Sequence, residues 1–204
     1  GIEVVMLTGD NAGTAKRMWA DQPEDAPKPI YALPSVESEL LRSYFRAGPW
    51  SNFTDAGEPP RLGKYHMATL RPGEATPIAG TAMQVTPFPL AHGGTESTAF
   101  LIEHGRDAML CFGDTGPDPV EHADAMHRIW AAVADRVRER RLKAVIVEVS
   151  FPSDRPDDKL FGHLTPRWLL ASLHELEALA GGRGSLKGLT VVVSHVKYAL
   201  TREQ

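Results

Sequence analysis

The sequence predicts an α/β fold in which helices cover a sheet, and three observations support this prediction. Residues 65–112 consist of short runs rich in apolar and β-branched side chains, which is typical of neighbouring strands. Residues 120–140 place apolar side chains at helical spacing opposite a charged face. Residues 143–149 are nearly all apolar or β-branched, which indicates a strand covered on both faces. A β-rich segment followed by alternating helices and strands fits a sheet with helices on its outer faces.

The N-terminal part alternates short elements with polar loops. The predicted elements are a strand or helix end at 2–7, a strand at 30–33, and a helix that begins with Ser35 as its N-cap. Loops rich in proline and charged or polar residues separate them at 21–29 and 54–64.

The β-rich middle of the chain is expected to contain strands at 65–70, 80–90, 97–103 and 107–112. The last two strands are joined at His104-Gly105-Arg106, which predicts a hairpin.

The C-terminal part has clear start and stop signals. Thr165 followed by Pro166 predicts a helix N-cap with proline in the first helical position. Gly181-Gly182 ends that helix. Residues 189–193 then predict a second buried strand.

The composition is that of a soluble globular protein, and we expect residues 1–204 to form a single domain or one large part of a domain. The net charge of −4 argues against a nucleic-acid polymer as partner. No apolar stretch approaches the roughly 18 residues that span a bilayer, so no membrane is expected as partner. The single cysteine, Cys111, excludes an internal disulfide and predicts a buried thiol.

Three short motifs place metal-ligand residues where apolar runs give way to glycine, serine or threonine. They are Ala91-His92-Gly93, Gly113-Asp114-Thr115-Gly116 and Ser194-His195-Val196. Histidine and aspartate are the ligand types of zinc hydrolases, and a carboxylate between glycines at a strand end can bridge two cations. Taken alone, each is equally compatible with an ordinary loop histidine or turn aspartate. Three ligands are too few for two metals.

Glu148 lies inside an apolar strand, and a buried carboxylate is costly unless it has a partner. His163, just before a helix start, is the expected partner; the pair could donate a proton to a leaving alkoxide or could be purely structural. Lys197 follows His195 by two residues and could steer a phosphate. Asn52, beside Trp50 and Phe53, either lines a pocket or belongs to a packed loop.

Taken together, these motifs resemble the class II cyclic-nucleotide phosphodiesterases over roughly residues 30–197. The resemblance covers Ala91-His92-Gly93, Ser97-Thr98-Ala99-Phe100-Leu101-Ile102, Phe112-Gly113-Asp114-Thr115-Gly116-Pro117-Asp118, Glu148-Val149-Ser150-Phe151, Leu160-Phe161-Gly162-His163-Leu164-Thr165-Pro166 and Ser194-His195-Val196-Lys197. Ile30-Tyr31-Ala32-Leu33-Pro34 and Trp50-Ser51-Asn52-Phe53 are similar to that family as well.

The resemblance implies a metallo-β-lactamase-like αββα sandwich that holds two Zn²⁺ ions, with Mn²⁺ or Fe²⁺ as alternatives. It implies hydrolysis of 3′,5′-cyclic AMP or GMP to the 5′-monophosphate, with the small cyclic nucleotide as the partner. In these terms His92 ligates one metal, His195 ligates the other and Asp114 bridges both. His163, oriented by Glu148, protonates the leaving group. Substrate contacts are assigned to Thr165, Lys197 and Asn52.

Three departures from the family pattern shape the expectations. The family's His-x-His-x-Asp-His motif is absent, Ala91 stands where the family has serine, and Tyr198 stands where it has proline. Compared with the family, we also expect the final strand of the fold to be missing from this sequence. We therefore expect a sandwich incomplete at both ends, or a member that has lost the motif. The metal affinity and turnover of the 204-residue chain itself should then be low.

Two alternatives from other classes stay open: a phosphodiesterase of the same fold that acts on RNA, similar to the 3′-tRNA-processing enzymes, and a degenerate, non-catalytic domain. The acidic balance weighs against the RNA enzyme. The preference for cyclic AMP or cyclic GMP, a homodimer, and a cytoplasmic or periplasmic location are not decided by the sequence.

Overall fold

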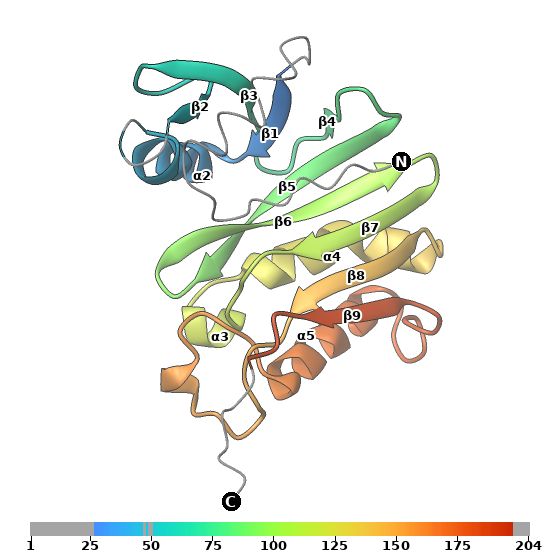
Figure 1. The fold of residues 1–204 in the computed structure, drawn as a ribbon. Coiled ribbons are helices and arrows are strands. Elements are labelled where there is room, and N and C mark those ends of the chain that lie inside the picture. The colour runs from blue at the N-terminus through green and yellow to red at the C-terminus, as the bar shows by residue number, and fades with distance from the viewer. Residues whose placement is uncertain (1–26, 47, 49–50, 198–204) are drawn as a thin grey trace, which may run out of the picture. The chain divides into compact units, whose positions relative to one another are not determined.

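The computed structural model describes residues 27–46, 48 and 51–197 (Figure 1). The element expected at 2–7 and most of the loop expected at 21–29 lie outside these residues. The chain divides into two compact units, residues 1–69 and residues 70–204. The expectation that both belong to one domain stays a prediction. No helix in the described ranges is long and apolar enough to cross a membrane.

The first unit contains a three-stranded sheet and a short helical segment. Its strands are β1 (Lys28–Ala32), β2 (Asn52–Thr54) and β3 (Arg61–Thr69), in the order β1-β3-β2. Its helical segment comprises α2 (Pro34–Glu39) and a π-helical turn, η1 (Leu40–Tyr44).

Two details of the first unit differ from the prediction. Leu33, not Ser35, is the N-cap of α2, because Pro34 takes the first helical position, where its fixed φ and missing N–H cost nothing. The loop expected at 54–64 is shorter, because β3 already begins at Arg61.

The second unit contains a six-stranded sheet in the order β4-β5-β6-β7-β8-β9. The strands are β4 (Thr76–Pro77), β5 (Met83–His92), β6 (Thr95–His104), β7 (Asp107–Phe112), β8 (Leu142–Glu148) and β9 (Thr190–Ser194). Strands β4 to β7 pair antiparallel, and β7, β8 and β9 pair parallel. The helical segments are α3 (Asp118–Glu121), α4 (Ala125–Arg138), the 3₁₀ turn η2 (Asp157–Lys159) and α5 (Pro166–Leu179). Helices α4 and α5 lie along one face of this sheet (Figure 1).

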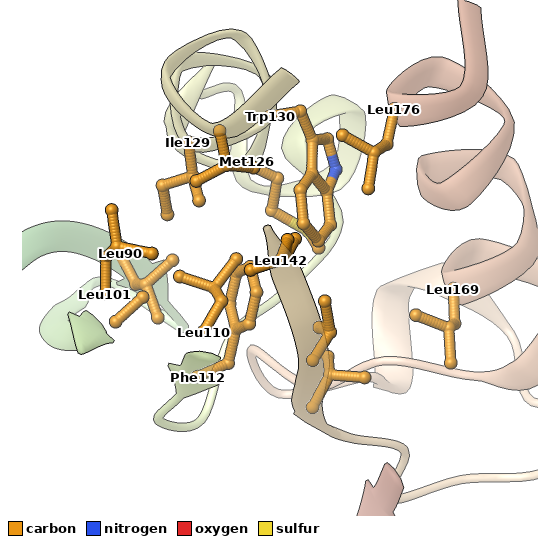
Figure 2. Close-up of a cluster of buried hydrophobic side chains, with 14 of the residues drawn as sticks. Leu90, Leu101, Leu110, Phe112, Met126, Ile129, Trp130, Leu142, Leu169 and Leu176 are labelled. Carbon is orange, nitrogen blue, oxygen red and sulfur yellow. The ribbon is translucent and has the colours of Figure 1, made fainter. Parts of the chain in front are cut away.

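The core of the second unit lies between the sheet and these two helices. Trp130 of α4 is fully buried; its ring packs 5.2 Å from that of Phe112, and its indole N–H donates to Ser172 Oγ of α5. Figure 2 shows Leu101 and Leu110 of the sheet facing Met126 and Ile129 of α4. Burial of such side chains is the main force that holds the helices against the strands.

The predictions of the hairpin turn and of the start and end of α5 are confirmed. The hairpin between β6 and β7 turns at Gly105, whose φ of 57° suits glycine. Thr165 is the N-cap of α5, with its side chain accepting from the Trp168 N–H. Helix α5 ends at Leu179, just before Gly181-Gly182.

Three expectations in the second unit are wrong. The helix expected at 120–140 is split, because His122 adopts a left-handed φ of 54° between α3 and α4. Strand β9 is not buried: among the described strands it lies at the edge of the sheet, so Val192 and Val193 are exposed. Cys111 is half-buried, because it faces away from α4 and α5, although partial burial still raises the pKa of its thiol.

Candidate metal centre

Four strands of the six-stranded sheet deliver their carboxyl ends to the same edge. Strands β5 and β7 run in the same direction on either side of β6, and β7, β8 and β9 are parallel. The segments that follow these strands therefore meet. His92 ends β5, Asp114 follows β7, Glu148 ends β8 and His195 follows β9. Ligands and substrates of α/β sheets commonly bind at this edge.

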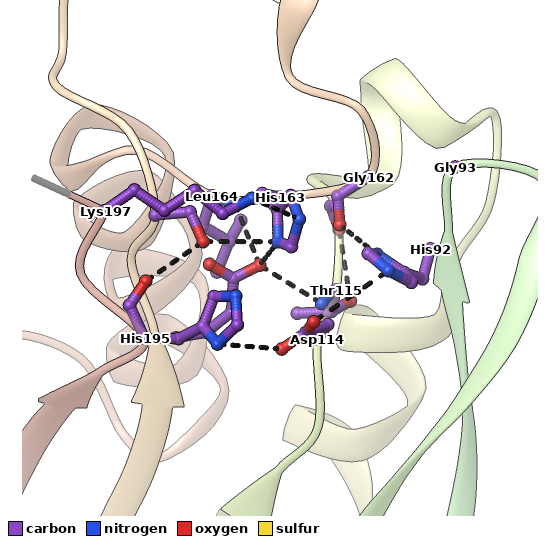
Figure 3. A network of polar contacts seen from close by, with 12 residues as sticks. His92, Gly93, Asp114, Thr115, Gly162, His163, Leu164, His195 and Lys197 are labelled. Atoms are coloured by element: carbon purple, nitrogen blue, oxygen red, sulfur yellow. Dashed lines mark hydrogen bonds and ion pairs between the residues drawn. The ribbon is translucent and has the colours of Figure 1, made fainter. Parts of the chain in front are cut away.

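Asp114 lies between two histidines (Figure 3). Its Oδ2 is 3.9 Å from His92 Nε2, and its Oδ1 is 3.7 Å from His195 Nδ1. The convergence expected from the sequence is therefore present, and each carboxylate oxygen faces a different imidazole. The His92, Asp114 and His195 side chains are 26%, 36% and 45% exposed, so the cluster is open to a small ligand.

The orientation of His92 is fixed by its second nitrogen. Nδ1 lies 2.8 Å from the carbonyl oxygen of Gly162, which can only accept, so Nδ1 carries the proton. The lone pair of Nε2 then faces Asp114. A hydrogen bond of this kind to the far nitrogen is typical of metal-binding histidines.

The turn after His92 is held by Glu121, which the sequence analysis missed. Glu121 Oε2 accepts from the Gly93 N–H at 2.9 Å, and the Gly116 N–H donates to the Ala91 carbonyl at 3.0 Å. No sequence signal marked Glu121, because its position fell within a stretch predicted as an ordinary amphipathic helix.

Glu148 and His163 form the buried pair that the sequence predicts. Glu148 is 1% exposed, and its Oε1 lies 2.8 Å from His163 Nδ1. The same oxygen accepts from the backbone N–H groups of Thr115 and Leu164, both at 3.3 Å. Because Glu148 Oε1 is the acceptor at Nδ1, His163 carries a proton on Nδ1, and its Nε2 faces Lys197.

Lys197 contacts this pair directly. Its Nζ lies 2.8 Å from His163 Nε2 and 4.7 Å from the centre of the Phe151 ring. The ring of His163 lies 4.8 Å from that of His92 and stacks 5.4 Å from that of His195. The Glu148–His163 pair and the cluster of His92, Asp114 and His195, called the metal-ligand cluster because it is the candidate metal site, therefore lie side by side.

The donor atoms fit a divalent cation. His92, Asp114 and His163 each offer a ligand atom within 4.8 Å of the others. Asp114 also faces His195 through its second carboxylate oxygen. His163 is the weaker candidate for a metal ligand, because the Lys197 ammonium faces its free nitrogen. His92, His195 and the two oxygens of Asp114 provide four donor atoms, with each imidazole facing a different oxygen, which is about half of what two four-coordinate ions need.

Two residues assigned to substrate binding have structural contacts. Thr165 is fully buried and caps α5. Asn52 is fully buried in the first unit, where its amide donates to the carbonyls of Ala56 and Glu58 and its oxygen accepts from Thr54. These contacts favour the packed-loop interpretation of Asn52. Direct substrate contact by either residue stays a prediction, and Trp50 lies outside the described residues.

The fold and this site define a class. The chain superposes on a crystal structure of the metallo-β-lactamase fold protein YhfI from Bacillus subtilis with a TM-score of 0.54 at 13% identity, covering 92% of this chain and 59% of that one. The predicted metallo-β-lactamase-like sandwich is confirmed as the fold class, and the fold suggests a divalent metal at the strand ends.

Within that class, residues 15–204 match the family model of class-II cAMP phosphodiesterases, and the chain belongs to this family. It is 44% identical over 183 residues to a 3′,5′-cyclic-nucleotide phosphodiesterase of Aliivibrio fischeri, covering 89% of this chain and 55% of that protein. It is 41% identical over 182 residues to a probable enzyme of the same name from Yersinia pestis, with coverage of 89% and 53%.

The solved structure of unliganded yeast PDE1 superposes with a TM-score of 0.81 at 27% identity, covering 92% of this chain and 53% of that one. The chain thus spans about half the length of the relatives that it matches.

Proposed function

We propose that this chain forms part of the active site of a metal-dependent phosphodiesterase that hydrolyses 3′,5′-cyclic nucleotides to nucleoside 5′-monophosphates. The observation that supports this most is the placement of Asp114 between His92 and His195, with one carboxylate oxygen toward each imidazole. The family and its named relatives supply the substrate class.

We propose Zn²⁺ as the metal, with Mn²⁺ or Fe²⁺ as alternatives, and His92, Asp114 and His195 are the residues that would hold it. When bound, divalent ions activate a water molecule and neutralise charge on the phosphate. His92 is held for this task by Gly162, and the turn that bears it is held by Glu121.

The buried pair of Glu148 and His163 supplies a proton to the leaving oxygen. Glu148 keeps the Nδ1 proton of His163 and stabilises the positive charge of the imidazolium. The imidazolium carries a second proton, taken up from solvent on Nε2; His163 would donate this proton to the departing 3′-oxygen and return to the neutral form protonated on Nδ1. Lys197, beside that nitrogen, supplies positive charge next to the phosphate.

The test replaces Asp114 by asparagine, in the 204-residue chain alone and in the protein as its gene encodes it. Asparagine keeps the shape of the side chain but removes the negative charge that would help to hold a cation. We expect metal content, measured by elemental analysis, to fall, and cyclic AMP hydrolysis to fall by about 100-fold or more. The control is Asp135→Asn on the exposed face of α4.

Unchanged hydrolysis in Asp114→Asn would contradict the proposed site. Two tightly bound zinc ions in the 204-residue chain alone would contradict the low metal affinity expected from its donor count.

A further inference from the structure

Phe161 combines an exposed aromatic side chain with a left-handed backbone conformation. Its side chain is 67% exposed, the highest value among the large hydrophobic side chains of the described residues. Its φ of 51° is left-handed, which phenylalanine rarely adopts, and Gly162 follows with a φ of 80°. Backbone conformations of this kind cost free energy and concentrate at functional sites.

The backbone around Phe161 is held tightly against the metal-ligand turn. A Cβ atom on Gly162 would lie 2.2 Å from the Gly93 nitrogen and 2.6 Å from the His92 carbonyl carbon. The Gly162 carbonyl also accepts from His92 Nδ1. Phe161 is therefore displayed by a fixed loop, and its Cα lies at most about 7 Å from that of His163, two residues along.

The Phe161 ring continues a row of aromatic and cationic side chains that starts at the site. The Phe151 ring lies 5.8 Å from the His163 ring. The Arg155 guanidinium lies 4.6 Å from the centre of the Phe151 ring and 5.8 Å from that of Phe161. Arg155 Nε donates to the Lys159 carbonyl at 2.9 Å, which fixes its direction. We call Phe151, Arg155 and Phe161 the aromatic row.

We propose that the aromatic row is the nucleobase subsite of this enzyme, with Phe161 as the stacking surface. The inference rests on the proposed function, because the phosphate of the nucleotide must lie at the metal-ligand cluster. An exposed phenyl ring beside a guanidinium offers a π-face and a cation, which are the groups that bind bases by stacking. Stacking accepts every base, so adenine and guanine nucleotides should both bind.

The experiment compares 5′-AMP and 5′-GMP with ribose 5-phosphate, which has the same phosphate and sugar but no base. Binding is measured by calorimetry in the enzyme used for the Asp114 test. In Phe161→Ala we expect the affinity for both nucleotides to fall by about 5- to 150-fold, the range of one base–aromatic stack. The affinity for ribose 5-phosphate and the metal content should not change.

Three variants sharpen the result. Phe161→Trp keeps a stacking face and should retain nucleotide affinity. Arg155→Ala should weaken both nucleotides less than Phe161→Ala does. Leu170→Ala removes an exposed apolar side chain of α5 (58% exposed) and serves as the matched control, with no change expected.

Failure of this inference is distinguishable from failure of the proposed function. If the unaltered enzyme binds neither the nucleotides nor ribose 5-phosphate and hydrolyses no cyclic nucleotide, the proposed function is wrong and the inference with it. If the enzyme is active but Phe161→Ala binds 5′-AMP as tightly as before, the aromatic row is not the base subsite and the function stands.

Discussion

At the scale of single residues, Glu148 determines how the site presents His163. Its carboxylate is buried, and one oxygen accepts from the imidazole and two backbone N–H groups. Its other oxygen, Oε2, is the buried side-chain polar atom without a hydrogen-bond partner among the described residues. Burying a carboxylate with one unpaired oxygen costs free energy. We infer that Glu148 is useful here for its effect on His163, not for stability.

We expect Glu148→Gln to lower phosphodiesterase activity by about 10- to 100-fold, the usual effect of a partner behind a site histidine. The amide keeps a hydrogen-bond acceptor but no longer stabilises an imidazolium. Steady-state kinetics and circular dichroism would separate lost activity from lost folding. Glu139→Gln, at an exposed position, is the control and should behave as the unaltered enzyme. Full activity in Glu148→Gln would remove the pair from the mechanism.

The sequence predicts only part of this site. His92, Asp114 and His195 were recognisable because each stands where an apolar strand meets small residues, and Glu148 because a lone carboxylate in an apolar strand needs a partner. Glu121 and Phe161 were not, because their roles depend on contacts with residues distant in sequence. Lys197 was placed near the phosphate, but its contact with His163 could come only from the structure.

At the scale of elements, α4 and α5 are linked by polar contacts at the rim of their apolar interface. His127 of α4 hydrogen-bonds Glu175 of α5, and this hydrogen bond raises the pKa of His127 above its ordinary value of about 6.5. A raised pKa in the folded state means that the protonated ring stabilises the fold below the pKa of the unfolded chain. This contribution is lost as the pH rises through the folded-state pKa.

We expect Glu175→Gln to lower the free energy of unfolding at pH 5.5, with the difference from the unaltered chain shrinking by pH 8.5. Urea unfolding at the two pH values measures the difference, and the higher pH serves as the internal control. An NMR titration should show the His127 pKa falling toward its ordinary value in Glu175→Gln. A difference independent of pH would mean that His127 and Glu175 are not coupled.

The elements themselves were predictable where local chemistry decides. The Thr165 cap, the Gly105 turn and the apolar runs of β6, β7 and β8 all appear where the sequence places them. The exposure of β9 was not predictable, because a run of valines looks the same at the edge of a sheet as at its centre. The break between α3 and α4 depends on a left-handed histidine that no pattern marks.

At the scale of the whole molecule, the second unit depends on one continuous core beneath its sheet. We expect Leu110→Ala to lower the free energy of unfolding by about 2–5 kcal/mol, because this fully buried side chain would leave a cavity between β7 and the helices. Denaturant unfolding measures the loss. Leu170→Ala, on the exposed face of α5, should cost about 0.5 kcal/mol or less. Equal losses would contradict the assignment of Leu110 to the core.

The contact between Gly162 and Gly93 has a consequence for how this molecule can vary and move. Two loops from distant parts of the chain touch backbone to backbone, with no side chain between them to absorb a displacement. A shift of one loop would therefore displace the other, so we expect the positions of His92 and His163 to be coupled. Any side chain at position 162 would collide with the backbone of His92 and Gly93, so we expect this position to accept glycine alone.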